Sequence, residues 1–113
     1  MINLSDCKQI HCIGIGGIGL SAIAEILLSR GYKVTGSDMR ESDITAKLEA
    51  DGGKIFIGHR AENIDGADLV VYSAAVSVEN PEMAKAKELG IPTASRAEIL
   101  GLLMSEYENS IAV

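Results

Sequence analysis

The feature that most constrains this fold is the stretch 10–19, Ile-His-Cys-Ile-Gly-Ile-Gly-Gly-Ile-Gly, in which an apolar strand runs into the pattern G-x-G-x-x-G. We expect Gly14 to permit the tight turn out of the strand, Gly16 to let phosphates approach the backbone, and Gly19 to let the next helix pack on the strand. The first N–H groups of that helix lack intrahelical partners and carry partial positive charge. A diphosphate group is the expected occupant.

The residues that follow the glycines strengthen this interpretation, because G-x-G-x-x-G alone is a weak pattern. A helix is expected directly after it, and Asp38 follows about 20 residues on, at the end of a second predicted strand. An acidic residue in that position can accept hydrogen bonds from ribose hydroxyls or from a base. Together these features predict a site for a nucleotide diphosphate.

The rest of the chain alternates short apolar strands with helices. Strands are expected at 10–13, 33–37, 54–57, 69–72 and 91–93, helices at 18–30, 44–51, 81–88 and 96–106, and the start of a further strand at 110–113. The polar segment 58–68 is too short for a comfortable crossover helix. This alternation predicts a single α/β domain with a Rossmann-like, doubly wound parallel sheet of about five strands.

The expected topology also places the site. With the strand order 3-2-1-4-5, ligands bind beyond the carboxyl ends of the strands, where the order reverses. That edge brings together the turn at Gly14, the pair Ser37 and Asp38, the loop with His59, and the small residues 73–75. Four separate stretches therefore converge on one predicted site.

Composition and charge argue against several classes of function. The chain has 113 residues, enough for one domain, and its formal net charge of −6 disfavours a nucleic-acid partner. The absence of a signal peptide and of any apolar run of membrane-spanning length leads us to expect a cytoplasmic protein without membrane contact. Cys7 and Cys12 fit neither a zinc site nor a redox C-x-x-C motif, and no metal site is expected.

A set of motifs resembles the N-terminal domain of the Mur ligases over nearly the whole chain. The motifs are Ile-Gly-Ile-Gly-Gly-Ile-Gly-Leu-Ser at 13–21, Gly-Ser-Asp at 36–38, Gly-His-Arg at 58–60 with Glu62 and Asn63, Ser-Ala-Ala at 73–75, Asn-Pro-Glu at 80–82, Gly-Ile-Pro at 90–92 and Arg-Ala-Glu-Ile-Leu at 96–100. This combination is far more specific than the glycine pattern alone.

The resemblance implies that residues 1–109 bind the uridine-diphosphate part of UDP-N-acetylmuramate. The glycine loop would hold the diphosphate, His59 and Asn63 match the family's polar loop near the uracil, and Ser73 is a candidate donor to pyrophosphate or ribose. The full set of predicted substrate-binding residues is Gly14, Ile15, Gly16, Gly17, Ile18, Gly19, Ser37, Asp38, His59, Asn63, Ser73 and Ala74. His11 is interpreted as structural, and the role of Arg96 is left open.

The resemblance also implies what this chain does not contain. In the family, ATP and Mg²⁺ bind a central domain whose phosphate loop follows a strand like 110–113, and a C-terminal domain contributes to amino-acid binding. The chain thus resembles one excised domain, with no catalytic residue and no cofactor of its own, whose partners are those two domains. We expect it to bind substrate without catalysing ligation, since it lacks G-x-x-x-x-G-K-[ST].

Two alternatives stay open at this point. An NAD-binding module of an oxidoreductase or a regulatory NAD sensor shares the glycine loop and Asp38, but it leaves residues 58–60 and 73–75 without a role. Within the family, the related ligase that attaches a recovered murein tripeptide to the same nucleotide sugar is the nearer alternative. The residues here do not fix which amino acid or peptide is ligated.

Overall fold

The computed structural model describes residues 7–73, 76 and 79–111, and contains a five-stranded sheet in which every strand pair is parallel. The order is β3-β2-β1-β4-β5, which confirms the doubly wound topology expected from the sequence. The strands are β1 (Gln9–Ile13), β2 (Lys33–Asp38), β3 (Lys54–Ile57), β4 (Leu69–Tyr72) and β5 (Thr93–Ser95).

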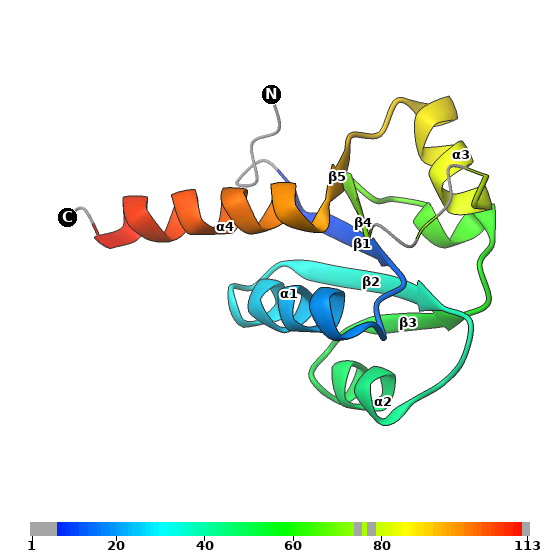
Figure 1. Cartoon of the computed structure of the whole chain (residues 1–113), viewed down its shortest axis with the longest axis horizontal. Helices are drawn as coiled ribbons and strands as arrows, with labels where there is room; N and C mark the ends of the chain where they lie inside the picture. The colour runs from blue at the N-terminus through cyan, green and yellow to red at the C-terminus, as the bar shows by residue number, and fades with distance from the viewer. Residues whose placement is uncertain (1–6, 74–75, 77–78, 112–113) are drawn as a thin grey trace.

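Helices cover both faces of the sheet (Figure 1). One face packs against α1 (Ile18–Ser29), α2 (Asp43–Ala50) and α4 (Arg96–Ile111). The other face packs against the short 3-10 helix η2 (Ala61–Ile64) and α3 (Pro81–Leu89). Each face therefore has its own hydrophobic cluster, as a parallel sheet buried on both sides requires.

Side-chain alternation along β1 separates the two clusters. Ile10 and Cys12 belong to the cluster under α1 and α4, whereas Ile13 belongs to the cluster under η2 and α3. His11 shares the second face with Ile13, since successive strand residues point to opposite sides. Its register partner on β2 is Thr35, so two polar side chains meet in the middle of a buried sheet face.

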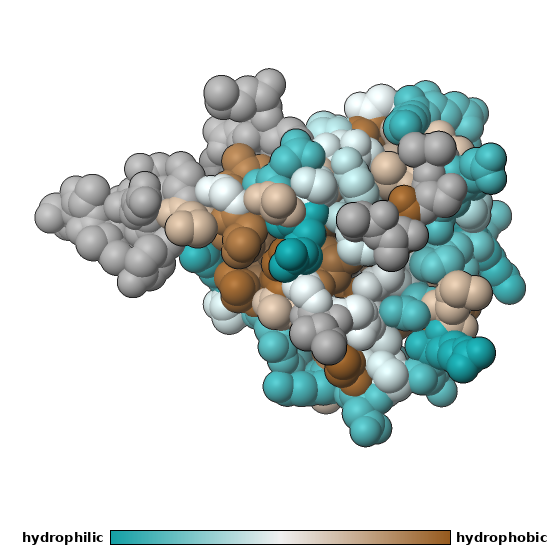
Figure 2. Space-filling model, in the orientation of Figure 1, coloured by the Kyte–Doolittle hydropathy of each residue, from teal (hydrophilic) through white to brown (hydrophobic). Residues whose placement is uncertain are grey.

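Helix α4 leaves apolar surface exposed beside α1. Figure 2 shows this apolar surface gathered over the two helices on the visible side of the molecule. The exposed large apolar residues of these helices are Ile26, Leu100 and Met104. No helix in the described part of the chain is both long and apolar enough to cross a membrane.

Three elements differ from the sequence-based expectations by more than a one-residue shift at their ends. Strand β5 begins at Thr93, not Ile91; the carbonyl of Pro92 accepts the Val70 N–H at 3.0 Å, but proline has no N–H to continue the ladder. The segment 58–68 contains the 3-10 helix η2. Helix α4 continues to Ile111, so the strand expected from Ser110 is helical at its first two residues.

The longer α4 has a simple sequence reason. No glycine or proline follows Gly101 before residue 111, so no residue in that stretch breaks the helix. Residues 112 and 113, the rest of the expected strand, lie outside the described residues.

Candidate functional site

The glycine loop closes against the end of β2. The N–H groups of Gly14 and Ile15 both donate to the carbonyl of Ser37, at 2.8 and 3.0 Å. Gly14 has φ +80° with open space where a β-carbon would lie, so the turn needs glycine for its conformation and not for room. An ideal β-carbon on Gly36 would lie 2.7 Å from Cβ of Ile15, which shows how closely loop and strand approach.

Asp38 binds this loop directly. Its Oδ2 accepts the N–H of Gly16 at 2.8 Å, and its Oδ1 accepts the N–H of Met39 at 2.7 Å. An ideal β-carbon on Gly16 would lie 2.6 Å from Oδ2 of Asp38 and 3.2 Å from Cγ2 of Thr45. The side chains of Asp38 and Thr45 therefore explain why position 16 is a glycine, without a bound phosphate.

The unused donors lie slightly further along the chain, in the first turn of α1. The N–H groups of Gly19 and Leu20 make no hydrogen bond to a described residue. The neighbour of Gly19 is the Arg96 side chain, whose Cδ lies 2.7 Å from an ideal β-carbon there. Gly19 thus makes room for a residue of α4, whereas close packing on the strand was expected. An anion at this helix end would meet free N–H donors.

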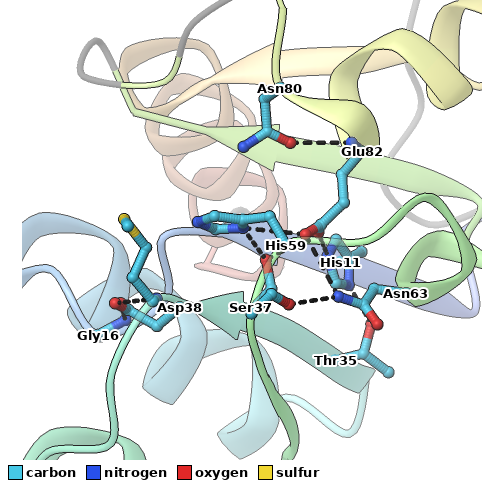
Figure 3. A network of polar contacts seen from close by, with 11 residues as sticks. His11, Gly16, Thr35, Ser37, Asp38, His59, Asn63, Asn80 and Glu82 are labelled. Carbon is cyan, nitrogen blue, oxygen red and sulfur yellow. Dashed lines mark hydrogen bonds and ion pairs between the residues drawn. The ribbon is translucent and has the colours of Figure 1, made fainter.

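On the face of the sheet that η2 and α3 cover, six polar residues form what we call the Glu82 cluster (Figure 3). They are His11, Thr35, Ser37, His59, Asn63 and Glu82. Oε1 of Glu82 accepts from His11 Nε2 and, at 2.7 Å, from the Ser37 hydroxyl. Oε2 accepts from His59 Nδ1 at 2.9 Å and from Asn63 Nδ2 at 3.3 Å. Each carboxylate oxygen therefore has two donors.

These contacts decide the charge of Glu82. Its side chain is completely buried, and burial by itself would raise the pKa of a carboxyl group. Hydrogen bonds from His11, Ser37 and His59, together with the charge of His11, outweigh burial and lower the pKa of Glu82 below its ordinary value. The cluster therefore holds an ionised carboxylate in the interior.

Sequence reasoning missed Glu82 because its setting resembles an ordinary helix start. Pro81 is the first residue of α3, and Oδ1 of the capping residue Asn80 accepts the Glu82 N–H at 2.9 Å. An acid in a first turn is normally explained by the helix dipole. A signal was nevertheless present in β2, where Thr35 and Ser37 are polar at alternate positions of a buried strand.

The structure gathers some predicted site residues and separates others. Ser37, His59 and Asn63 lie together in the Glu82 cluster, while Asp38 lies with the glycine loop. Ser73 follows β4, and no hydrogen bond among the described residues joins its hydroxyl to either group. Ala74 lies outside the described residues. His11, interpreted as structural, is buried as a core residue would be.

The described part of the chain contains no group of three or more His, Cys, Asp or Glu residues that could hold a metal ion. A surface hollow of about 360 Å³ lies over the start of α2, lined by Glu41, Ser42, Asp43, Thr45, Ala46 and Glu49. None of the predicted site residues lines this hollow. Three of the residues that line the hollow, Glu41, Asp43 and Glu49, carry carboxylates, which would repel a bound anion. The hollow therefore gives no support to an anion site.

Comparison with known proteins assigns the fold and its glycine loop to a family. The model of the Mur ligase family, catalytic domain, matches residues 9–108. The UDP-N-acetylmuramate–L-alanine ligase of Alkaliphilus metalliredigens is 62% identical over 106 residues, which cover 94% of this chain and 23% of that protein.

Solved structures agree. The crystal structure of the UDP-N-acetylmuramate–alanine ligase MurC from Thermotoga maritima superposes with a TM-score of 0.83 at 38% identity, over 87% of this chain and 23% of that one. The crystal structure of the UDP-N-acetylmuramate:L-alanyl-γ-D-glutamyl-meso-diaminopimelate ligase (MPL) from Neisseria meningitidis gives a TM-score of 0.73 at 30% identity, over 79% of this chain and 28% of that one. The chain spans about a quarter of the length of these relatives. It belongs to the Mur ligase family.

Proposed function

We propose that this chain binds the UDP moiety of UDP-N-acetylmuramate, as the N-terminal domain of the ATP-dependent ligase that adds L-alanine in peptidoglycan precursor synthesis. The observation that carries the proposal is the 62% identity to a UDP-N-acetylmuramate–L-alanine ligase over nearly the whole chain. The related tripeptide ligase is a weaker match, at 30% identity and a lower TM-score. Recognition of the nucleotide sugar is common to both candidates.

The proposed site follows the carboxyl edge of the sheet. The diphosphate would lie at the start of α1, where the N–H groups of Gly19 and Leu20 have no described partner. The remaining carboxylate lone pairs of Asp38 would accept hydrogen bonds from the ribose. The base would lie on the side of Ser37, His59 and Asn63, and Ser73 would contribute from the end of β4. Ala74 stays a predicted contact outside the described residues.

Ligation itself is proposed only for the longer protein. The sequence contains no G-x-x-x-x-G-K-[ST] motif, the phosphate loop that we expect to hold ATP in the family. ATP and Mg²⁺ would bind a central domain of the full enzyme, and a C-terminal domain would help to bind the amino acid. We place that enzyme in the cytoplasm, as the resemblance implies.

A thermal-shift and competition experiment tests the proposal. Ligands that bind only the folded state raise its melting temperature by mass action, so we expect UDP-N-acetylmuramate and UDP to stabilise the chain more than NAD or ATP. Glu62 is exposed in η2 and makes no described side-chain contact, so Glu62→Gln is a control that should respond as the parent does. NAD binding as tight as UDP binding would contradict the ligase assignment.

A further inference from the structure

The contacts of His59 determine which of its ring nitrogens carries a proton. His59 Nδ1 lies 2.9 Å from Oε2 of Glu82 and 3.0 Å from Oγ of Ser37. An ionised carboxylate can only accept hydrogen bonds. The single hydroxyl proton of Ser37 is directed to the other carboxylate oxygen, Oε1, at 2.7 Å. Neither neighbour can donate to Nδ1, so Nδ1 itself must be the donor.

Asn63 restrains the loop that carries His59. Its Nδ2 group donates both to the carbonyl of Gly58, at 2.9 Å, and to Oε2 of Glu82, at 3.3 Å. Glu82 therefore contacts the ring of His59 directly and, through Asn63, the backbone immediately before it. A buried residue with both contacts fixes the position of the ring as well as its protonation.

The second ring nitrogen of His59 is available to a ligand. Nε2 has no hydrogen-bond partner among the described residues, and the side chain is 20% exposed. Figure 3 shows this nitrogen pointing away from Glu82, toward the side on which Gly16 and Asp38 lie. In a neutral imidazole with its proton on Nδ1, Nε2 is a hydrogen-bond acceptor.

We propose that Glu82 is a positioning residue that fixes His59 in the Nδ1–H form, so that Nε2 accepts a hydrogen bond from an N–H group of the bound base. This inference rests on the proposed function, because it explains which base the same site prefers. Uracil presents an N–H at position 3, whereas cytosine presents a bare nitrogen acceptor there. The fixed form of His59 therefore selects UDP over CDP.

Glu82→Gln is the discriminating variant. The Ser37 hydroxyl lies 2.7 Å from Oε1 beside the short contact of His11 Nε2, whereas His59 Nδ1 and Asn63 Nδ2 lie 2.9 and 3.3 Å from Oε2, so we expect the amide oxygen on the Oε1 side. The NH₂ group then faces Asn63, which keeps its bond to the Gly58 carbonyl, and His59 Nδ1, which must accept, so the His59 proton moves to Nε2. We expect the parent to bind UDP about tenfold tighter than CDP, and Glu82→Gln to lose most of that preference. Glu62→Gln, an exposed acid-to-amide change, should keep it.

Nitrogen-15 NMR of the histidine rings measures the protonation directly, at a pH of about 8, where free imidazole is neutral. The chain has two histidines, so a spectrum of His59→Ala assigns the signals. We expect Nδ1–H for His59 in the parent, and a shift toward Nε2–H in Glu82→Gln. The parent spectrum tests the positioning role even if that variant does not fold.

The outcomes distinguish the positioning role of Glu82 from the role of His59 in selecting the base. A parent in which His59 carries its proton on Nε2, or a Glu82→Gln protein with unchanged protonation, would overturn the positioning role. A change of protonation without a change in the UDP-to-CDP preference would overturn the role in base selection. Failure of the parent to bind UDP would contradict the proposed function, while the parent spectrum would still decide whether Glu82 fixes His59.

Discussion

Oδ2 of Asp38 lies 2.8 Å from the backbone nitrogen of Gly16 and accepts its N–H, which ties the end of β2 to the glycine loop. The carboxylate thereby occupies one of the donors that a bound phosphate would otherwise use. In the opening turn of α1, the N–H groups of Gly19 and Leu20 have no hydrogen-bond partner among the described residues. Asp38 therefore shapes the loop and, in the proposed complex, leaves the diphosphate to the helix terminus.

Asp38→Ala should weaken UDP binding without weakening pyrophosphate binding. The substitution removes the charged acceptor that we propose for the ribose, and hydrogen bonds to charged groups contribute about 1.5–3 kcal/mol, which corresponds to roughly tenfold or more in affinity. Pyrophosphate has no ribose, and it gains the released Gly16 N–H. Calorimetric titration with the two ligands measures both effects. An equal loss for both ligands would indicate a disturbed loop.

Gly16→Ala should destabilise the chain, whereas Gly101→Ala should stabilise it. A β-carbon at position 16 would lie 2.6 Å from Oδ2 of Asp38 and 3.2 Å from Cγ2 of Thr45, so the Asp38 contact must shift. Gly101 lies inside α4 with nothing within 4 Å, where alanine is favoured by about 0.5–1 kcal/mol. Urea unfolding of the two variants and the parent gives the comparison, and the same sign for both substitutions would refute it.

The sheet order and most element boundaries were predictable because the chain alternates apolar strands and helices with clear end signals. Gly90, for example, ends α3 with φ +72°, as the sequence indicates. The two main boundary errors come from local competition. Pro92 interrupts the expected strand, and the absence of a helix-breaking residue lets α4 continue to Ile111. Both outcomes have a reason in the sequence, the missing N–H of proline and the lack of a helix breaker after Gly101, but the apolar pattern used to place the strands does not register either one.

The site was only partly predictable, for a reason that Glu82 illustrates. His59 and Asn63 were expected as ligand contacts, and the structure shows that both also donate to a buried carboxylate 19–23 residues further along the chain. The pairing of His11 with Glu82 spans 71 residues. Periodicity and motif spacing describe local structure, and they carry no information on which polar residues will meet across a sheet face.

The two cysteines should differ strongly in reactivity. Cys12 is completely buried in β1, and burial raises the pKa of its thiol to about 12, so almost no thiolate forms near neutral pH. Cys7 is only half-buried. Titration of the native chain with a thiol reagent at a pH of about 8 should label Cys7 rapidly and Cys12 only at the rate of unfolding. Rapid labelling of Cys12 in a Cys7→Ser variant would contradict this expectation.

His11→Leu should destabilise the chain. The substitution removes one of the two donors to Oε1 of Glu82 and leaves the Ser37 hydroxyl as the one described donor to that oxygen of a buried carboxylate. A hydrogen bond to a charged group typically contributes about 1.5–3 kcal/mol. Urea unfolding of the variant and the parent measures the loss, and equal stability would show that His11 contributes little to holding the carboxylate.

The dependence of stability on acid pH should report the ionised state of Glu82. Its pKa in the folded chain lies below the ordinary value of 4.5, because hydrogen bonds and the charge of His11 outweigh burial. The folded state therefore binds fewer protons than the unfolded chain in acid, so this contribution is full above a pH of about 4.5 and is lost as pH falls through the folded-state pKa. Urea unfolding from neutral pH to about pH 3 measures the slope.

Glu82→Gln provides the comparison for that measurement. The variant should be less stable than the parent near neutral pH, and its stability should fall less steeply in acid, since it has no carboxyl group at position 82 to protonate. Asp68, exposed and bonded to the N–H groups of Lys8 and Gln9, also has a lowered pKa, but it is present in both proteins. Its contribution cancels in the difference between the two curves. Parallel acid slopes for parent and variant would show that folding does not lower the pKa of Glu82.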